Sequence, residues 1–297
     1  MRVRIISRDN GYGLSQDIAI LRGALIGTSG QRMEVGYVDW RSTPVGKYDM
    51  NIFLELLNPA FYGYAAQNVL VPNPEWFMAS WLPHLKGLDA VWCKTHDATR
   101  IFAMHRPQYI GWTSRDCLEP TVPRERLLLH AAGDSTEKGT RHVIAAMHML
   151  PEYQLTLLTS QKWGPLPSNI TLRGRLDERQ FVIEQNRHMI HVCPSTYEGF
   201  GHYINEARSI GAFIITTNAP PMNELVTAEF GMGCAVASTG PERMGYAHQA
   251  DPIELANCIR AAMEAPEESL MACGVKARAA YLAARNEFDT NLIRVLS

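Results

Sequence analysis

The feature that most constrains the fold of this chain is an alternation of short apolar runs with helical segments, which occurs twice. Near the start, VRIIS (3–7) precedes a glycine-containing loop and then IAILRGALIG (18–27), whose apolar residues have helical spacing. Farther along, RLLLHAAG (126–133) precedes a polar loop and another helical segment. Such alternation is typical of parallel sheets that helices cover on both faces. The sequence therefore predicts an α/β protein with two similar halves.

Each half contains further runs that we expect to form strands. In the first half they are residues 33–40, 49–57, 67–76 and 88–103, the last of which continues into a helix. In the second half they are residues 153–160, 170–176, 189–195 and 212–218, with a helix expected at 177–188. The segment 252–288 is expected to be helical with a break at Pro266, because proline interrupts a helix.

Length and a central irregular segment indicate two domains. A chain of 297 residues exceeds the usual size of one hydrophobic core. The stretch GWTSRDCLEPTVPRER (111–126) interrupts the pattern with prolines and charges, as domain linkers do. We therefore expect one domain at 1–118 and a second at 119–280.

Composition argues against several classes of protein. Hydrophobic residues make up 46% of the chain and charged residues 20%, as in an average globular protein, and a formal net charge of -2 does not call for an anionic partner. The six cysteines include no C-x-x-C pair, which argues against a zinc site and favours a reducing compartment. We expect the first residues, MRVRIIS, to form a strand and not a secretory leader, and the sequence has no run of about 18 consecutive apolar residues. We therefore expect a cytoplasmic protein without an integral membrane segment.

The stretch PSTYEGFGHYINEARSIGA (194–212) is the strongest candidate for a binding site. It follows an expected strand, and ligands of open parallel sheets bind at the carboxyl ends of the strands. Gly199 and Gly201 let the backbone approach a ligand, and the start of the following helix favours a phosphate. Glu206, farther into that helix, is suited to accepting hydrogen bonds from sugar hydroxyls. Phosphate and hydroxyl recognition together indicate a nucleotide.

The same stretch carries a resemblance to a known family. YEGFGHYINEARSIGAFIITTNAPPMNELV (197–226) resembles the E-x7-E segment of retaining glycosyltransferases with the GT-B fold, especially glycosyltransferase family 4, and LLLHAAGDSTEKGTRHVIAAM (127–147) resembles the segment that opens their donor domain. The resemblance implies two Rossmann-like doubly wound domains that face each other across a cleft. It also implies an acceptor domain at 1–118, a nucleotide-sugar donor domain at 119–280, and a C-terminal helix at 281–297 that packs back on the N-terminal domain.

By this resemblance, Lys138 contacts the donor pyrophosphate and Glu198 faces the transferred sugar, and these two are the expected catalytic residues. Glu206 holds the ribose. The remaining donor-binding candidates lie in the two loops or, for Arg173, within the expected strand at 170–176: Gly133, Ser135, Arg173, Gly199, Phe200, Gly201 and His202. The family usually has an arginine five or six residues before the lysine, where this chain has Gly133 and Ala132, so Arg173 or Arg175 and backbone amides would have to assist Lys138.

The first half resembles the family only in its architecture. Many relatives have a histidine after the fourth strand, where this chain has PNPEWF (72–77), so Asn73 or Glu75 is the candidate there. Gly11 and Gly13, in a loop that is not G-x-G-x-x-G, and His96 complete the acceptor-side candidates.

Structural explanations compete with these roles. Lys138 could be only the polar start of a helix, and the two glutamates could be surface and helix residues without a ligand. His130 and His191 border apolar strands, where a histidine is more often a hydrogen-bonded core residue than a catalyst.

The expected function is that of a retaining, metal-independent glycosyltransferase of the hexosyltransferase type. It requires no metal and no cofactor beyond its co-substrate, a UDP- or GDP-sugar, because lysine and helix N-termini supply positive charge. The acceptor is open: a small molecule, a glycan, a protein or a modified nucleic-acid base. The alternatives are a GT-B nucleotide-sugar epimerase and a catalytically inactive nucleotide-sugar-binding protein.

Overall fold

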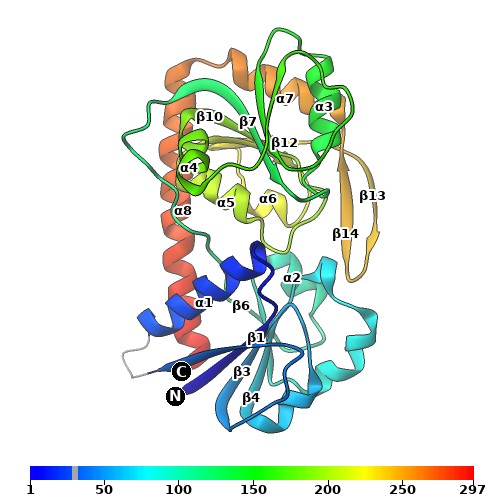
Figure 1. Ribbon diagram of the computed structural model, residues 1–297, viewed down its shortest axis with the longest axis vertical. Helices are drawn as coiled ribbons and strands as arrows, with labels where there is room; N and C mark the ends of the chain where they lie inside the picture. Colours follow the sequence, from blue (N-terminus) through cyan, green and yellow to red (C-terminus); the bar gives the residue numbers. More distant parts are fainter. Residues whose placement is uncertain (29–32) are drawn as a thin grey trace. The chain divides into compact units, whose positions relative to one another are not determined.

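A computed structural model describes residues 1–28 and 33–297 (Figure 1). The chain divides into two compact units. The first unit comprises Met1–Arg115, Pro241–Tyr246 and Ala283–Ser297, and the second comprises Asp116–Gly240 and Ala247–Leu282. The sequence analysis expected domain boundaries after residues 118 and 280, whereas the two compact units divide after residues 115 and 282. Both ends of the chain belong to the first unit.

The first unit contains a six-stranded parallel sheet in the order β2-β1-β3-β4-β5-β6. Its strands are β1 Arg2–Ser7, β2 Glu34–Asp39, β3 Tyr48–Leu54, β4 Ala65–Val71, β5 Ala90–Cys93 and β6 Pro107–Tyr109. Its helical segments are α1 Gly13–Thr28, η1 Pro59–Tyr64, η2 Pro74–Trp76, η3 Ala79–Gly87 and α2 His96–Ile101, to which the end of α8 Glu267–Leu296 is added. The strand order changes direction between β1 and β3, and α/β sheets bind ligands at such switch points.

Two strands of the first unit end earlier than the sequence predicted. The expected strand at 67–76 stops at Val71, and η2 follows it, because Pro72 and Pro74 cannot donate backbone hydrogen bonds to a sheet. The expected strand at 49–57 stops at Leu54, because Glu55 has a positive φ of 64° that breaks the extended backbone.

The second unit contains another six-stranded parallel sheet, in the order β12-β11-β10-β7-β8-β9. Its strands are β7 Glu125–Gly133, β8 Leu155–Thr159, β9 Ile170–Arg173, β10 His188–Cys193, β11 Phe213–Thr217 and β12 Gly231–Cys234. Its helices are α3 Thr140–His148, α4 Glu178–Arg187, α5 His202–Ser209, α6 Met222–Leu225, α7 Pro252–Glu264 and the first part of α8. The switch point of this sheet lies between β7 and β10.

Local sequence signals explain where several of these helices begin and end. Asp177 and Gln180 form a reciprocal capping box at the start of α4. The helix therefore begins at Glu178, one residue later than expected. The expected break at Pro266 is present, since α7 ends at Glu264 and α8 begins at Glu267. Among the described residues, no helix has both the length and the apolar character needed to cross a membrane.

A two-stranded hairpin was not predicted. It consists of β13 Val236–Glu242 and β14 Gly245–Ala250, and its tip, Pro241–Tyr246, belongs to the first unit. The segment VASTGPERMGYAHQA has few large apolar residues, so it carries little of the pattern from which a strand can be predicted.

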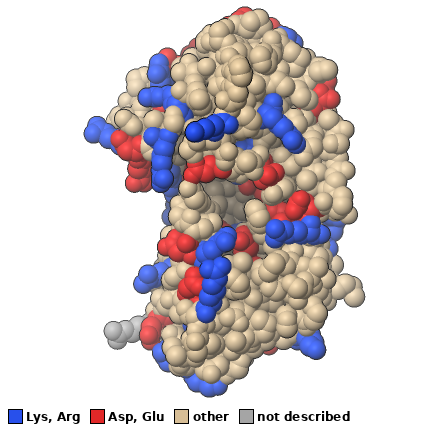
Figure 2. Space-filling model, turned by 45° about the vertical axis from the view of Figure 1, so that its right-hand side comes forward, with Lys and Arg blue, Asp and Glu red and all other residues tan. Residues whose placement is uncertain are grey.

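Both sheets are buried between helices, and each unit has its own core. Strand β10 is buried at every position, and with β7, α3 and α7 it forms the core of the second unit. The core of the first unit includes the aromatic residues Phe53, Phe77 and Phe102, the last two of which meet edge to face at 5.3 Å. On the face shown in Figure 2, acidic and basic side chains are interspersed, and neither sign forms an extended patch.

Candidate functional site

The loops that follow β7 and β10 are held together at the switch point of the second sheet. The amide of Thr196, in the loop after β10, donates a hydrogen bond to the carbonyl of Glu137, in the loop after β7, at 2.8 Å. These loops are the two segments that carry the family resemblance. Parallel strands end at the same edge of a sheet, so strand order brings together motifs that are far apart in the sequence.

Gly139 lies tightly against the loop after β10. It has a φ of 71°, and a Cβ at this position would lie 2.0 Å from the carbonyl oxygen of Pro194. An L-residue would therefore be strained both by its backbone conformation and by the contact. Only glycine lets the start of α3 approach the loop after β10 this closely.

The central feature of the site is an ion pair between Lys138 and Glu198. The Nζ atom of Lys138 lies 2.5 Å from Oε1 of Glu198, and the hydroxyl of Ser195 donates to the same oxygen at 2.5 Å. The Ser195 and Tyr203 hydroxyl oxygens are 2.6 Å apart. The side chains of Lys138 and Glu198 are 19% and 9% exposed, so the pair is largely shielded from solvent.

Tyr203 closes one side of this cluster. The Nζ atom of Lys138 lies 4.2 Å from the centroid of the Tyr203 ring, in the range of a cation–π contact. Burial raises the pKa of the Tyr203 phenol above its ordinary range, so this residue remains a neutral hydrogen-bonding group. The sequence analysis missed Ser195 and Tyr203, although both lie within the motif.

The Gly199–Gly201 segment leads directly into α5. Gly201 is the N-cap of α5 with a φ of 96°, and Phe200 is buried. The ring of His202, the first residue of α5, meets that of Phe200 edge to face at 5.7 Å. The backbone amides at the start of α5 therefore follow immediately after Glu198, where an anion would be favoured.

Glu206 is 4% exposed and is held by a residue of the preceding helix. The side-chain amide of Gln185, near the end of α4, donates to Oε2 of Glu206 at 3.1 Å. Gln185 is 1% exposed, and its backbone carbonyl accepts a hydrogen bond from His191 at 2.9 Å. The sequence analysis missed Gln185, because nothing in α4 marks the residue that will face α5.

The other donor-side candidates occupy different positions. The carbonyl of Gly133 accepts a hydrogen bond from Thr159, and Ser135 accepts one from the amide of Glu137, so both shape the loop after β7. Arg173 ends the edge strand β9 and forms an ion pair with Glu184. Because β8 separates β9 from β7, Arg173 is not brought to the Lys138–Glu198 pair by adjacent strands.

His130 and His191 are buried and hydrogen-bonded. His130 contacts the Val192 carbonyl at 2.6 Å and the Thr140 hydroxyl at 2.9 Å. Burial lowers the pKa of His130 to about 4 and that of His191 to about 3. Both are neutral near pH 7 and serve the core of the second unit.

In the first unit, Asn73 and Glu75 lie just after β4, and both are buried. The side-chain amide of Asn73 donates to Oε2 of Glu55 at 2.7 Å. Glu55 directly follows β3, on the other side of the switch point from β1, and is 6% exposed. Burial raises the pKa of its carboxyl group. A buried carboxyl group on a strained backbone at a switch point marks a functional candidate that the sequence analysis missed.

A buried ion pair lies on the same unit. Lys94, directly after β5, forms an ion pair with Asp17 of α1, and each side chain is 3% exposed. The Nζ atom of Lys94 also lies 4.8 Å from the Trp112 ring centroid. Glu55, Asn73 and Lys94 therefore follow three neighbouring strands at one edge of the sheet.

Gly11, Gly13 and His96 have local structural roles in the first unit. The amide of Gly11 donates to the Ser15 hydroxyl at 2.7 Å, and Gly13 is the first residue of α1. His96 begins α2, and its exposed ring stacks on Tyr109 with 4.0 Å between centroids. Across residues 1–28 and 33–297, no three His, Cys, Asp or Glu residues gather as ligands of a metal ion would.

The fold is similar to that of solved glycosyltransferases. Sucrose-phosphate synthase from Thermosynechococcus elongatus aligns with 100% of this chain and 98% of its own, with a TM-score of 0.74 and 14% identity. HepE from Anabaena, solved in complex with UDP and glucose, aligns with 100% of this chain and 99% of its own, with a TM-score of 0.70 and 14% identity. The pneumococcal O-GlcNAc transferase GtfA, solved with UDP and GlcNAc, has a TM-score of 0.63 and 15% identity; 84% of this chain aligns with it and spans 57% of it.

The predicted fold class is confirmed by these likenesses. The chain has the GT-B fold, with two Rossmann-like α/β domains built on parallel six-stranded sheets. No protein-family model matches the sequence, and no curated protein is significantly similar to it in sequence. At identities of 14–15%, the likeness to solved structures defines the fold alone.

Proposed function

We propose that this protein is a retaining glycosyltransferase that moves a sugar from a nucleotide-sugar to an acceptor hydroxyl. The observation that carries the proposal is the Lys138–Glu198 pair at the β7/β10 switch point, with Nζ and Oε1 2.5 Å apart. A cation for a leaving diphosphate and a carboxylate for the transferred sugar lie side by side there. Structures that share this fold include complexes with UDP and glucose and with UDP and GlcNAc, so a UDP-hexose is the expected donor, with a GDP-sugar second.

Lys138 binds the diphosphate while it keeps its contact with Glu198. An ammonium group has three N–H donors, and Glu198 accepts one of them. The others, with backbone amides of the loop after β7 and of the start of α5, stabilise the negative charge that grows on the leaving diphosphate. Lysine and amides supply this charge without a metal ion, so the enzyme is metal-independent. Glu206 binds the ribose hydroxyls at the other end of the nucleotide.

Retention follows from attack on the same face of the sugar that the diphosphate leaves. The C–O bond to the diphosphate breaks, the acceptor oxygen bonds to the anomeric carbon, and the departing phosphate oxygen takes the acceptor proton. Glu198 positions the sugar through its hydroxyls and stabilises positive charge at the anomeric carbon. The acceptor binds to the first unit, where Glu55 and Asn73 offer hydrogen-bonding groups. Glu75 lies in the same loop as Asn73, and His96 follows the next strand, β5. The described cysteines are all free thiols, which supports a cytoplasmic enzyme.

Incubation with UDP-, GDP- and ADP-sugars, followed by proton NMR of the donor and of the released sugar before it mutarotates, tests the proposal. Slow release of the nucleoside diphosphate and of free sugar with unchanged anomeric configuration is expected, because water replaces the missing acceptor. An epimerised donor would show that the protein is an epimerase and not a transferase. Binding without turnover of any donor would identify an inactive nucleotide-sugar-binding protein.

Gln185→Ala should weaken recognition of the ribose without direct contact to the nucleotide. Loss of its 3.1 Å hydrogen bond removes one of the contacts that hold the Glu206 carboxylate in position toward the ribose. We expect the ratio of UDP affinity to 2',3'-dideoxy-UDP affinity to fall about 3- to 10-fold, as for the loss of one hydrogen bond, and to approach unity in Glu206→Ala. Calorimetry with both nucleotides measures this ratio.

Asn186→Ala is the matched control for Gln185→Ala. Asn186 is the next buried amide of α4, but its side chain donates to the carbonyls of Cys117 and Val182 instead of to Glu206. It should lower the melting temperature and leave the ribose preference unchanged. An equal change of preference in both variants would show that α4 acts only through stability.

A further inference from the structure

A pocket lies at the amino ends of the strands of the second sheet, whereas the Lys138–Glu198 pair lies at their carboxyl ends. Its volume is about 540 Å³, within the range of small-molecule sites. Arg124 directly precedes β7, Met189 lies near the start of β10, and Gly211 precedes β11, so the pocket opens at the amino ends of these parallel strands. The loops with Lys138 and Glu198 follow the carboxyl ends of β7 and β10. Strands of this length separate the two places by on the order of 20 Å.

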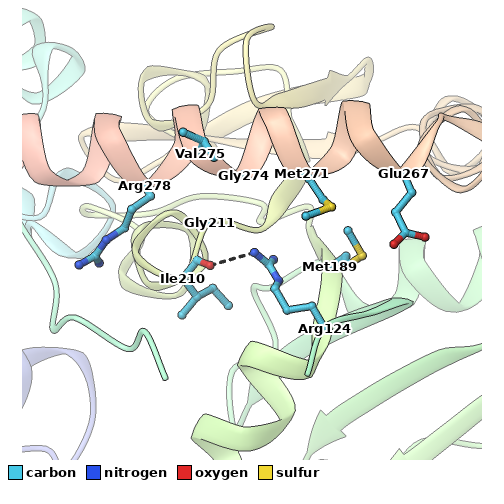
Figure 3. Close-up of a pocket in the computed structure, with 9 residues that line it drawn as sticks. All are labelled: Arg124, Met189, Ile210, Gly211, Glu267, Met271, Gly274, Val275 and Arg278. Carbon is cyan, nitrogen blue, oxygen red and sulfur yellow. Dashed lines mark hydrogen bonds between the residues drawn. The ribbon is translucent and has the colours of Figure 1, made fainter. Parts of the chain in front are cut away.

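One face of α8 forms the opposite wall of the pocket. Glu267, Met271, Gly274, Val275 and Arg278 line it at helical spacing. Figure 3 shows the side chains of Met189 and Met271 directed toward the same space, with the Arg124 guanidinium beneath α8.

The base of the pocket is a tight backbone contact. A Cβ at Gly274 would lie 2.4 Å from the Gly211 carbonyl oxygen, and one at Gly211 would lie 2.7 Å from that of Gly274. This contact holds α8 against the turn between α5 and β11, and it gives the pocket a rigid floor.

The apolar wall contains buried and exposed members. Met189 and Ile210 are 4% and 2% exposed, whereas Met271 and Val275, across from them on α8, are 59% and 73% exposed. Large apolar side chains that remain open to solvent beside buried ones offer surface that a hydrocarbon body would cover.

Arg124 provides a positive charge without an acidic partner. Its Nη1 atom donates to the Ile210 carbonyl at 3.2 Å, which uses one of five guanidinium N–H groups. Within residues 1–28 and 33–297, no carboxylate forms an ion pair with Arg124. Arg124 is exposed, and its guanidinium remains protonated, so its positive charge at the pocket is not compensated by a carboxylate of the described residues.

The other charged groups of the pocket define the charge of its occupant. Arg278 makes two hydrogen bonds to the Asp116 carboxylate, at 2.6 and 2.7 Å, and one to the Ser209 carbonyl at 2.7 Å. Its charge is therefore neutralised. Glu267 lies 3.9 Å from Arg126 and is 62% exposed, so it would oppose a second negative charge at the mouth. The pocket has room for one negative charge, at Arg124.

We propose that this pocket is a second binding site, for a small monoanion with an apolar body, such as a carboxylate on a short hydrocarbon chain. The carboxylate accepts hydrogen bonds from Arg124, and the hydrocarbon lies along Met189, Met271 and Val275. The site is distinct from the proposed nucleotide-sugar site, because the two share no lining residue. The first part of α8 forms its wall, and the last part of the same helix belongs to the first unit.

Octanoate is the probe, and methionine methyl groups are the reporters. Protein labelled with carbon-13 at the methionine methyls is titrated by NMR, and the signals of Met189 and Met271 are assigned from Met189→Leu and Met271→Leu. We expect octanoate to shift both signals saturably below its micelle-forming range. Octanol, with the same chain but no charge, and inorganic phosphate, with charge but no chain, should each bind about tenfold more weakly or worse.

Arg124→Gln should weaken octanoate binding about tenfold or more, because a charge-assisted pair is replaced by a neutral hydrogen bond. Met271→Asp, at an exposed position, provides a second variant that repels the carboxylate without disturbing the core. Arg285→Gln, on the exposed surface of α8 outside the pocket, removes the same charge and should leave binding unchanged.

Three results would overturn the proposal. They are the absence of saturable shifts with octanoate, equal affinity for octanol or phosphate, and unchanged octanoate binding in both Arg124→Gln and Met271→Asp.

Discussion

Lys138→Ala is expected to lower kcat/KM for the nucleotide-sugar by about 10²- to 10³-fold, the usual cost of losing one preorganised group that stabilises a leaving anion. The expected effect is large because this chain has Gly133 and Ala132 where the glycosyltransferases that its motifs resemble usually have an assisting arginine. Removal of the lysine also leaves Glu198, which is 9% exposed, without its cation beside the diphosphate. Diphosphate release from the donor that the panel identifies measures the rate, and calorimetry measures UDP affinity.

The ion pair predicts how a second substitution will behave. Glu198→Gln in the Lys138→Ala background should restore part of the UDP affinity, because it removes an uncompensated negative charge near the diphosphate. In the wild-type background, Glu198→Gln should reduce turnover much more than UDP affinity, because UDP lacks the sugar. Lys276→Ala is the control, since Lys276 is 57% exposed and lies 3.9 Å from Glu229. A loss below threefold in Lys138→Ala, or additive effects of the two substitutions on UDP binding, would contradict the assigned roles.

Gly139→Ala is expected to lower the free energy of unfolding by roughly 2–5 kcal/mol, the sum of a left-handed backbone cost and the strain of a backbone contact. The contact is the 2.0 Å approach of a Cβ to the Pro194 carbonyl oxygen, which cannot be relieved by turning a side chain. UDP affinity should fall as well, because the loops after β7 and β10 are forced apart. Urea denaturation of the whole protein, monitored by circular dichroism, measures the loss of unfolding free energy.

Gly133→Ala separates the two causes. Gly133 lies at the end of β7 and has a φ of 58°, but no atom lies within 4 Å of its would-be Cβ. Its substitution should therefore cost only the backbone term, about 1–2 kcal/mol. If both alanine variants lose the same free energy, the contact with Pro194 is not a constraint.

The sequence alone predicted five of the six strands of each sheet, because burial between two layers of helices demands continuous apolar runs. It missed the short edge strands β6 and β12, whose sequences PQY and GMGC contain no such run. Strands β7, β10 and β11 lie within one or two residues of their predicted positions, and the break at Pro266 is confirmed. The errors occur where a local backbone feature ends a strand, as at Glu55, or where a segment such as the β13–β14 hairpin lacks apolar alternation.

Part of the candidate site could also be predicted from the sequence. Gly139, Gly201 and the glutamates lie within short motifs whose spacing is local, so their places in loops and helices follow from the chain itself. The residues that touch them do not. Lys138 and Glu198 are 60 positions apart, and Gln185 and Glu206 are 21 apart.

The tertiary structure decided which loops meet, because strand order depends on the packing of whole sheets and not on any single segment. The order β10-β7 places Lys138 beside Glu198, and the order β3-β4 places Glu55 beside Asn73. The same packing moved Arg173 out to an edge strand and left Arg124 in a pocket at the amino ends of the strands. Local patterns of apolar residues determine the elements of this protein, whereas contacts between distant residues determine its sites.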